Sequence, residues 1–262
     1  MTLHNLYPQV FSCAALSLLA TSCTVYAPMQ PTISTISRQG QVEISGSVQA
    51  SGRVEGSVVY SPLPHVLVTG AGTFRPRLGD STFNTTRQGE LGLGGYLPLG
   101  KGWQLTGLAG YGRASTHRAY VEGTLLWGGG QTREEYTMRS GKLFGQTSLT
   151  HEGARGAVGA VYRLSKISFD QLDYAAVSYS YYASYPVPLR RMVRHEALVF
   201  GRYGLDAQNR WQLQATVGLS VAGAAEQSTT DDRRYSQANH LLLPVPITSL
   251  GVVFRPQLLG KK

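Results

Sequence analysis

Residues 211–219 read WQLQATVGL, with a mostly bulky apolar residue at every second position from Trp211 to Leu219. Residues 103–111 (WQLTGLAGY) and 42–48 (VEISGSV) repeat this alternation. A period of two places successive side chains on opposite faces of a β-strand. The sequence therefore predicts an all-β protein in which one face of each strand is mostly apolar and the other is polar or small.

Ten segments of this kind follow one another along the chain. They span residues 41–50, 54–61, 65–74, 87–98, 103–115, 138–150, 155–167, 192–203, 210–221 and 246–255. Most have about ten residues, the length that a transmembrane barrel strand needs, whereas strands of globular proteins are nearer five or six. We therefore expect an antiparallel up-and-down transmembrane β-barrel of about ten strands, with eight as the alternative.

The connections between these segments alternate between short and long. Short ones lie at 62–64, 99–102, 151–154 and 204–209, and long ones at 75–86, 116–137, 168–191 and 222–245. Only Ser51–Arg53 breaks the alternation. Short periplasmic turns and long external loops are typical of outer-membrane barrels. An even strand number then places both ends of the barrel, and the N-terminus with them, on the periplasmic side.

The N-terminal region resembles an export signal. Residues 10–20 (VFSCAALSLLA) are apolar but too short to span a bilayer as a helix. The small residues before Cys23 resemble a lipidation signal, and cleavage after Ala27 is the alternative, disfavoured by Pro28. We expect a signal peptide at 1–22, a periplasmic linker at 23–40 with a lipid on Cys23, a barrel at 41–256 and a tail at 257–262.

Composition excludes several classes of protein. Charged residues make up 15% of the chain, below the roughly 25% of soluble domains, and 31 glycines and 15 tyrosines suit a β protein. The net charge of +9 is scattered, so we expect no nucleic-acid partner. An anionic membrane surface fits this charge better. The predicted partners are outer-membrane lipids, with lipopolysaccharide or a surface protein as further candidates; the oligomeric state stays open.

Two groups of residues follow from the strand phase. Aromatic residues at the predicted periplasmic strand ends would form an interface girdle: Tyr60, Tyr96, Trp103, Tyr203, Trp211 and Phe254. Charged residues predicted to face the lumen are Glu43, Glu90, Arg163 and Arg202. Buried charges need partners, so we expect Glu–Arg pairs that plug the lumen, with a narrow ion path as the alternative.

No catalytic, metal-binding or cofactor-binding motif appears, and the body of the chain has no cysteine. We therefore expect no cofactor, no metal and a non-enzymatic role in the envelope, structural or interactive. The alternative is a surface hydrolase, because ten-stranded surface proteases use Asp and His on their outer loops. Its candidate residues are Asp170, Asp173, Asp231, Asp232 and His240.

The stretch from Tyr174 to Tyr185 (YAAVSYSYYASY) is rich in tyrosine, a residue suited to recognition. It predicts a surface-binding group of Tyr179, Tyr181, Tyr182, Arg190 and Arg191. Its alternative is an extension of the flanking strands beyond the membrane. A soluble periplasmic barrel holding an apolar ligand would instead turn its apolar face inward.

Several short motifs resemble outer-membrane β-barrel proteins and lipoproteins of the Bacteroidota type. They are Glu90–Arg113 (ELGLGGYLPLGKGWQLTGLAGYGR), Cys23 followed by Tyr26-Ala27-Pro28, Gln39–Glu43, Tyr60-Ser61-Pro62, and Gly141–Phe144 with Gln146. The likeness spans most of residues 23–255. It implies a fold and a location, but no activity and no functional residues.

Overall fold

The computed structural model describes residues 25–122, 132–178, 182–227 and 232–256. These residues form eleven strands and one helix. The strands are β1 (Val42–Gln49), β2 (Val54–Tyr60), β3 (Val66–Arg75), β4 (Phe83–Gly100), β5 (Trp103–Glu122), β6 (Thr132–Gly153), β7 (Gly156–Val177), β8 (Tyr182–Pro186), β9 (Leu189–Gly204), β10 (Trp211–Gln227) and β11 (Val245–Phe254). The helix, α2 (Asp232–Leu242), lies between β10 and β11.

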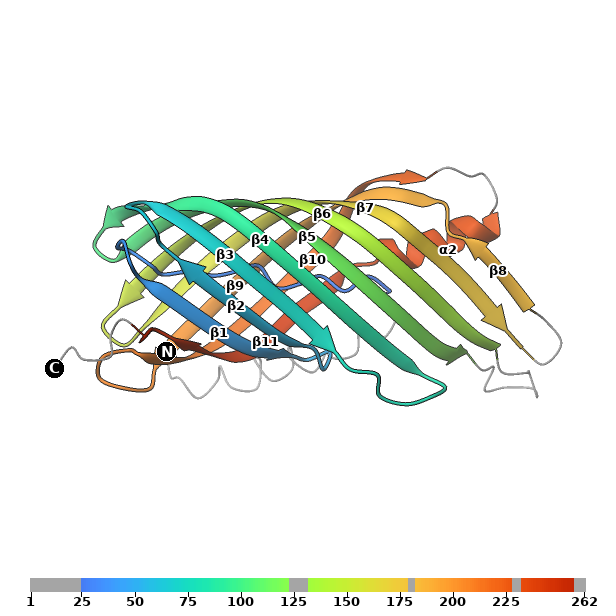
Figure 1. The fold of residues 1–262 in the computed structure, drawn as a ribbon, viewed down its shortest axis with the longest axis horizontal. Coiled ribbons are helices and arrows are strands. Elements are labelled where there is room, and N and C mark those ends of the chain that lie inside the picture. The colour runs from blue at the N-terminus through green and yellow to red at the C-terminus, as the bar shows by residue number, and fades with distance from the viewer. Residues whose placement is uncertain (1–24, 123–131, 179–181, 228–231, 257–262) are drawn as a thin grey trace, which may run out of the picture.

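The strands form a closed antiparallel barrel (Figure 1). Except for β8 and β9, each strand pairs with its neighbours in sequence, and the pairing of β1 with β11 closes the ring. β8 and β9 follow one another along the same partner, β7, so the eleven strands occupy ten positions in the wall. The prediction of a ten-stranded antiparallel barrel is confirmed. Closure gives each of the ten positions a partner on both sides, as a sheet in hydrocarbon requires.

The two ends of the barrel differ. One end, called the turn end below, carries the connections 61–65, 101–102, 154–155 and 205–210, together with the start of β1 and the end of β11. Lys101 and Gly102 both have positive φ, as the two-residue turns that match strand twist require. The opposite end, called the rim end, carries α2 and β8 (Figure 1).

The wall is much taller on one side than on the other. β5, β6 and β7 have 20, 22 and 22 residues, whereas β1 and β2 have 8 and 7. The predicted loops 116–137 and 168–191 are therefore wrong over much of their length, because β5–β9 continue through them. The strand extensions lack a continuous apolar outer face, so apolar and polar residues alternate only weakly in their sequence. The helix α2 was also unexpected.

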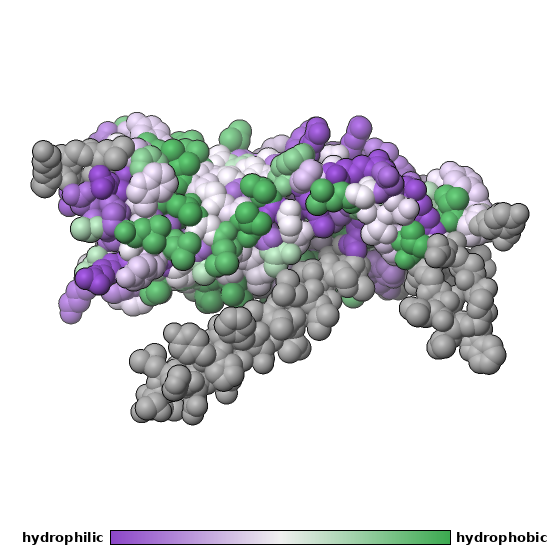
Figure 2. All heavy atoms as spheres, turned by 90° about the horizontal axis from the view of Figure 1, so that it is seen from below, coloured by the Kyte–Doolittle hydropathy of each residue, from purple (hydrophilic) through white to green (hydrophobic). Residues whose placement is uncertain are grey.

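The two faces of the wall have opposite polarity. Large apolar side chains point outward, for example Leu93 on β4 and Val217 on β10. The alternate positions face inward and are polar, for example Gln214 and Thr216 on β10. Figure 2 shows apolar residues spread over the wall and hydrophilic residues denser toward the rim end. A water-soluble barrel would bury its apolar face, so this is an outer-membrane type of barrel. No helix among the described residues is long and apolar enough to cross a membrane.

Residues 25–37 run through the interior of the barrel as extended chain (Figure 1). Val25 packs with Tyr136 and Tyr174 near the rim end, while Gly40 donates a backbone hydrogen bond to Ser61 at the turn end. The prediction of a periplasmic linker here is corrected: the segment is extended, but the lumen surrounds it. Its small polar residues suit a polar lumen as well as they suit water.

Candidate functional site

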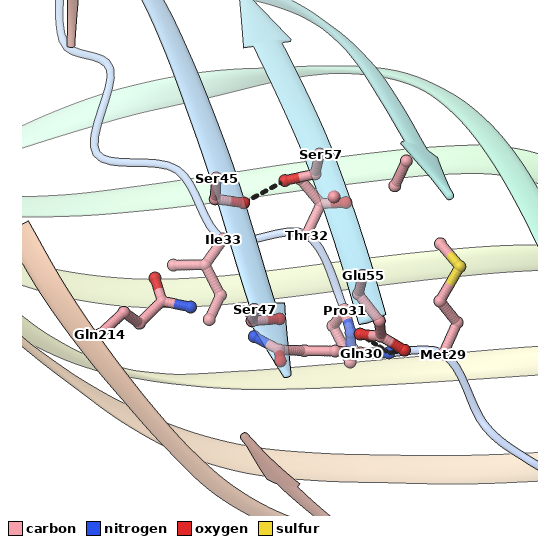
Figure 3. Close-up of a pocket in the computed structure, with 12 residues that line it drawn as sticks. Met29, Gln30, Pro31, Thr32, Ile33, Ser45, Ser47, Glu55, Ser57 and Gln214 are labelled. Atoms are coloured by element: carbon pink, nitrogen blue, oxygen red, sulfur yellow. Dashed lines mark hydrogen bonds between the residues drawn. The ribbon is translucent and has the colours of Figure 1, made fainter. Parts of the chain in front are cut away.

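The lumen is occupied by residues 25–37, called the plug below, and the wall satisfies the plug's polar groups. The Gln30 amide donates to Glu55 Oε2 at 3.2 Å, and its side chain donates to Thr216 Oγ1 at 3.2 Å. Ser249 Oγ donates to Gln30 Oε1 at 2.5 Å. Figure 3 shows Gln30 and its neighbours between β1, β2 and β10. Buried polar groups are costly without partners, so these bonds hold the plug in one position.

Further along the plug, wall side chains bond to its backbone. Gln146 Nε2 donates to the Thr32 carbonyl oxygen at 2.7 Å, and Arg202 Nη2 donates to the Ile33 carbonyl oxygen at 3.1 Å. Glu43 Oε2 accepts from Thr35 Oγ1 at 3.1 Å. An extended chain has no internal backbone bonds, so it depends on such partners. The plug is therefore an integrated part of the lumen.

All four predicted lumen charges face inward and are buried. Arg202 Nη1 lies 2.7 Å from Glu43 Oε1, and Arg163 Nη1 lies 3.0 Å from Glu90 Oε2. The structure thus brings the predicted residues together as two Glu–Arg pairs.

Other lumen charges were missed by sequence reasoning. Lys142 also pairs with Glu90, and the fully buried Glu196 lies 3.8 Å from Arg163 Nε. Arg194 is equally buried and donates to backbone carbonyl oxygens that include Leu241, in the last turn of α2. The alternation of side chains along each strand could have identified these charges, because each of them stands at an inward position of its strand.

Five of the six predicted girdle aromatics lie at the turn end with outward side chains. Tyr60, Trp103, Tyr203 and Trp211 are exposed, and the Phe254 ring stacks on Trp211 with 4.3 Å between centroids. Tyr96 is a correction, since it is only 5% exposed. Tyr96 and Glu90 both stand at even-numbered positions of β4, which face inward. Glu90 in the lumen and Tyr96 on the outer face were therefore incompatible predictions.

A row of basic residues follows the apolar wall toward the rim end. Each of the five neighbouring strands β4, β5, β6, β7 and β9 has an outward basic residue just beyond its outward apolar positions. In this order they are Arg87, Arg113, Arg139, Lys166 and Arg191. We call this set the basic row. Arg87, Arg113 and Arg139 line one shallow surface groove together with Asp170. Arg113 Nε donates to the Tyr111 hydroxyl at 2.8 Å.

The rim end holds an aromatic cluster that was not predicted. Tyr136 and Tyr174 pack edge to face with 5.1 Å between ring centroids, and Tyr136 donates a hydrogen bond to Gln237 of α2. Leu241 and Val25 belong to the same buried cluster. Together these contacts cover the rim side of the plug.

The predicted surface-binding residues are only partly described. Tyr179 and Tyr181 lie outside the described residues, whereas Tyr182 on β8 is 70% exposed. Arg190 is exposed, and Arg191 lies 3.6 Å from Glu226 on β10. This stretch extends the wall beyond the apolar region, the alternative considered from the sequence.

The described candidate hydrolase residues stand on two different elements, β7 and α2. Asp170 is exposed in the groove of the basic row, and Asp173 accepts a bond from Gln171 Nε2 at 2.6 Å. His240 lies in the last turn of α2, and Asp232 begins that helix. Asp231 lies outside the described residues, as does Cys23. No group of three or more His, Cys, Asp or Glu arranged for a metal ion is found among the residues described.

Electrostatic pairing also orders the turn end. In the connection between β9 and β10, Arg210 Nε donates to Asp206 Oδ2 at 2.6 Å. This bond and one from the Trp211 amide lower the pKa of the Asp206 carboxyl. The turn therefore holds Trp211 at the start of its strand, at the level of the girdle.

Comparisons with known proteins support the fold only. No protein-family model matches the chain, and no curated protein is similar to it in sequence. Among solved structures it is similar to the outer membrane protease OmpT from Escherichia coli, at 10% identity and a TM-score of 0.48, covering 82% of this chain and 93% of that one. The narrower resemblance to the Bacteroidota type gains no support and stays a prediction. The expectation of a non-enzymatic role is not kept, since the similar barrel is named as a protease; the likeness itself concerns the fold alone.

Proposed function

We propose that this protein is a self-closed outer-membrane barrel that acts at the cell surface through its rim end, and not by passing solutes. One observation carries the proposal: the plug occupies the lumen and is bonded to the wall along its length. The short connections gather at the turn end, which supports a periplasmic turn end and an external rim end. The parts of the protein that act at the cell surface are then the tall side of the wall and α2.

Conductance tests this proposal directly. In planar lipid bilayers the full-length protein should give no stepwise ion current, because the plug and the paired charges leave no continuous water path. A variant lacking residues 25–37 should conduct, since it loses only the interior chain. Folding of both is checked by heat-modifiable electrophoretic mobility. Steady single-channel currents from the full-length protein would contradict the proposal.

The basic row supports an anionic lipid of the outer leaflet, such as lipopolysaccharide, as a partner. Its four guanidinium groups and one ammonium group lie where the apolar wall ends, the level at which phosphorylated headgroups sit. A basic residue near an anionic membrane surface contributes about 1 kcal/mol. Bidentate geometry makes arginine well suited to phosphate.

The double variant Arg87→Gln/Arg139→Gln should bind vesicles containing lipid A roughly 30-fold more weakly than the wild type, about 2 kcal/mol for two cations. Flotation of the detergent-purified protein with such vesicles measures this. The matched control is Arg38→Gln/Arg155→Gln, which removes two exposed arginines from the turn end. Equal loss in both double variants would show that net charge alone matters.

A further inference from the structure

A cleft at the rim end lies on the low side of the barrel, where the wall strands are short. Its inner chamber is lined by the turn between β1 and β2, the starts of β4 and β11, the end of β3, and Tyr26 of the plug. An adjoining outer cleft of about 280 Å³ shares Ser51, Arg75 and Asn84 with it. The inner chamber and the outer cleft meet at these three residues, and the two together are called the recess below.

Arg53 is one of the residues that line the inner chamber. Its side chain is 3% exposed, and its Nη2 donates to the Pro28 carbonyl oxygen at 2.7 Å and to Gln49 Oε1. Its Nε donates to Ser51 Oγ at 3.2 Å. Its Nη1 is buried and has no hydrogen-bond partner among the described residues. A buried charged group with an unpaired N–H donor is costly, so this atom favours an acceptor from outside the chain.

Arg75 adds a second cation to the same chamber. It is half-buried at the end of β3, and no described carboxylate lies within ion-pair distance of it. The acid nearest to Arg53 is Glu55, at 4.0 Å from Nη2. Two guanidinium groups against one carboxylate leave a net positive charge. Burial lowers the pKa of Arg53, and the charge of Arg75 lowers it further against the opposing effect of Glu55.

The shape of the recess suggests the size of the ligand. The inner chamber has about 30 Å³, and a water-sized group takes roughly 10–15 Å³, so about two anion oxygens fit. The outer cleft is lined by Phe83 and Tyr120 as well as Arg118. Rings beside cations suit the body of a small polar molecule.

We propose that this recess binds a small phosphate-bearing molecule, with the phosphate between Arg53 and Arg75. The body of the ligand lies in the outer cleft, against Phe83 and Tyr120. The phosphate accepts from Arg53 Nη1, which has no hydrogen-bond partner among the described residues, and from the Arg75 guanidinium. Asn84 borders both chambers and contributes a polar amide.

Calorimetric titration of the full-length protein in detergent with glucose 6-phosphate tests the proposal. Wild type should bind saturably, and Arg75→Gln should bind about tenfold more weakly, since it loses one charge-assisted contact. The matched control Arg155→Gln, an exposed arginine at the turn end, should bind as wild type does. Arg75→Gln keeps a polar residue at this half-buried position, so the variant should fold. Asn84→Leu removes the amide of the recess and should independently weaken binding of glucose 6-phosphate.

No saturable binding by the wild type, or equal affinities for Arg75→Gln and Arg155→Gln, would overturn the proposal. A competition arm identifies the source of the phosphate. If micelles containing lipid A block glucose 6-phosphate, the natural ligand is a lipid headgroup; if they do not, it is a soluble ester. Either result is independent of the conductance of the barrel.

Discussion

The double variant Leu93→Arg/Val217→Arg should fail to assemble in lipid bilayers. Leu93 is 62% exposed and Val217 57% exposed, and each stands near the middle of the outward apolar positions of its strand. Arginine on the lipid face of a barrel costs about 2–4 kcal/mol at the bilayer midplane. The two sites lie on β4 and β10, which do not pair, so the costs should add to about 4–8 kcal/mol. That is comparable with the whole stability of a typical protein, about 5–15 kcal/mol.

The control for this variant is Tyr182→Arg. Tyr182 is more exposed than either site, at 70%, but it lies on β8 beyond the apolar wall. If water surrounded the whole barrel, all three positions would accept arginine equally well. If hydrocarbon surrounds only the apolar region, Tyr182→Arg should fold as the wild type does. Heat-modifiable mobility after refolding into vesicles reports the folded fraction; a fully folded double variant would refute a lipid-facing wall.

The strands in the membrane were predictable because hydrocarbon imposes a strict rule on them. In residues 211–219 every outward position is apolar and every inward one is polar or small, and β10 pairs with β11 in the register this implies. The extensions of β6 and β7 escaped prediction because water on their outer face accepts any residue. The outward positions of the β6 extension include Arg133 and Glu135, so the extension resembled a loop.

The plug escaped prediction for a related reason. A segment without internal hydrogen bonds can bond to water or to a polar lumen, and its composition does not distinguish the two. The phosphate recess was equally hidden. Arg53 and Arg75 are 22 positions apart and meet only because a turn and a strand end lie side by side at the rim. The lumen charges were easier, since strand phase alone assigns Glu43 and Arg202 to the interior.

Loss of Arg163 should destabilise the barrel more than any other single truncation in the lumen. Its guanidinium group is fully buried, lies 3.0 Å from Glu90 and 3.8 Å from Glu196, and donates to Gln146 Oε1 at 3.0 Å. Arg163→Met keeps the bulk of the side chain but leaves two buried carboxylates facing Lys142 alone at close range. Removing one partner of a buried ion pair costs about 3–5 kcal/mol, and we expect a loss in this range in urea unfolding of the detergent-solubilised protein.

A second substitution separates charge from packing. Neither carboxylate oxygen of Glu196 has a hydrogen-bond partner among the described residues, so Glu196→Gln alone should change stability by less than about 1 kcal/mol. In the Arg163→Met background the same change removes an uncompensated charge and should restore much of the lost stability. A double-mutant cycle measures this coupling. Additive effects of the two substitutions would mean that Arg163 stabilises the lumen by filling space, and the ion-pair account of the interior would then be wrong.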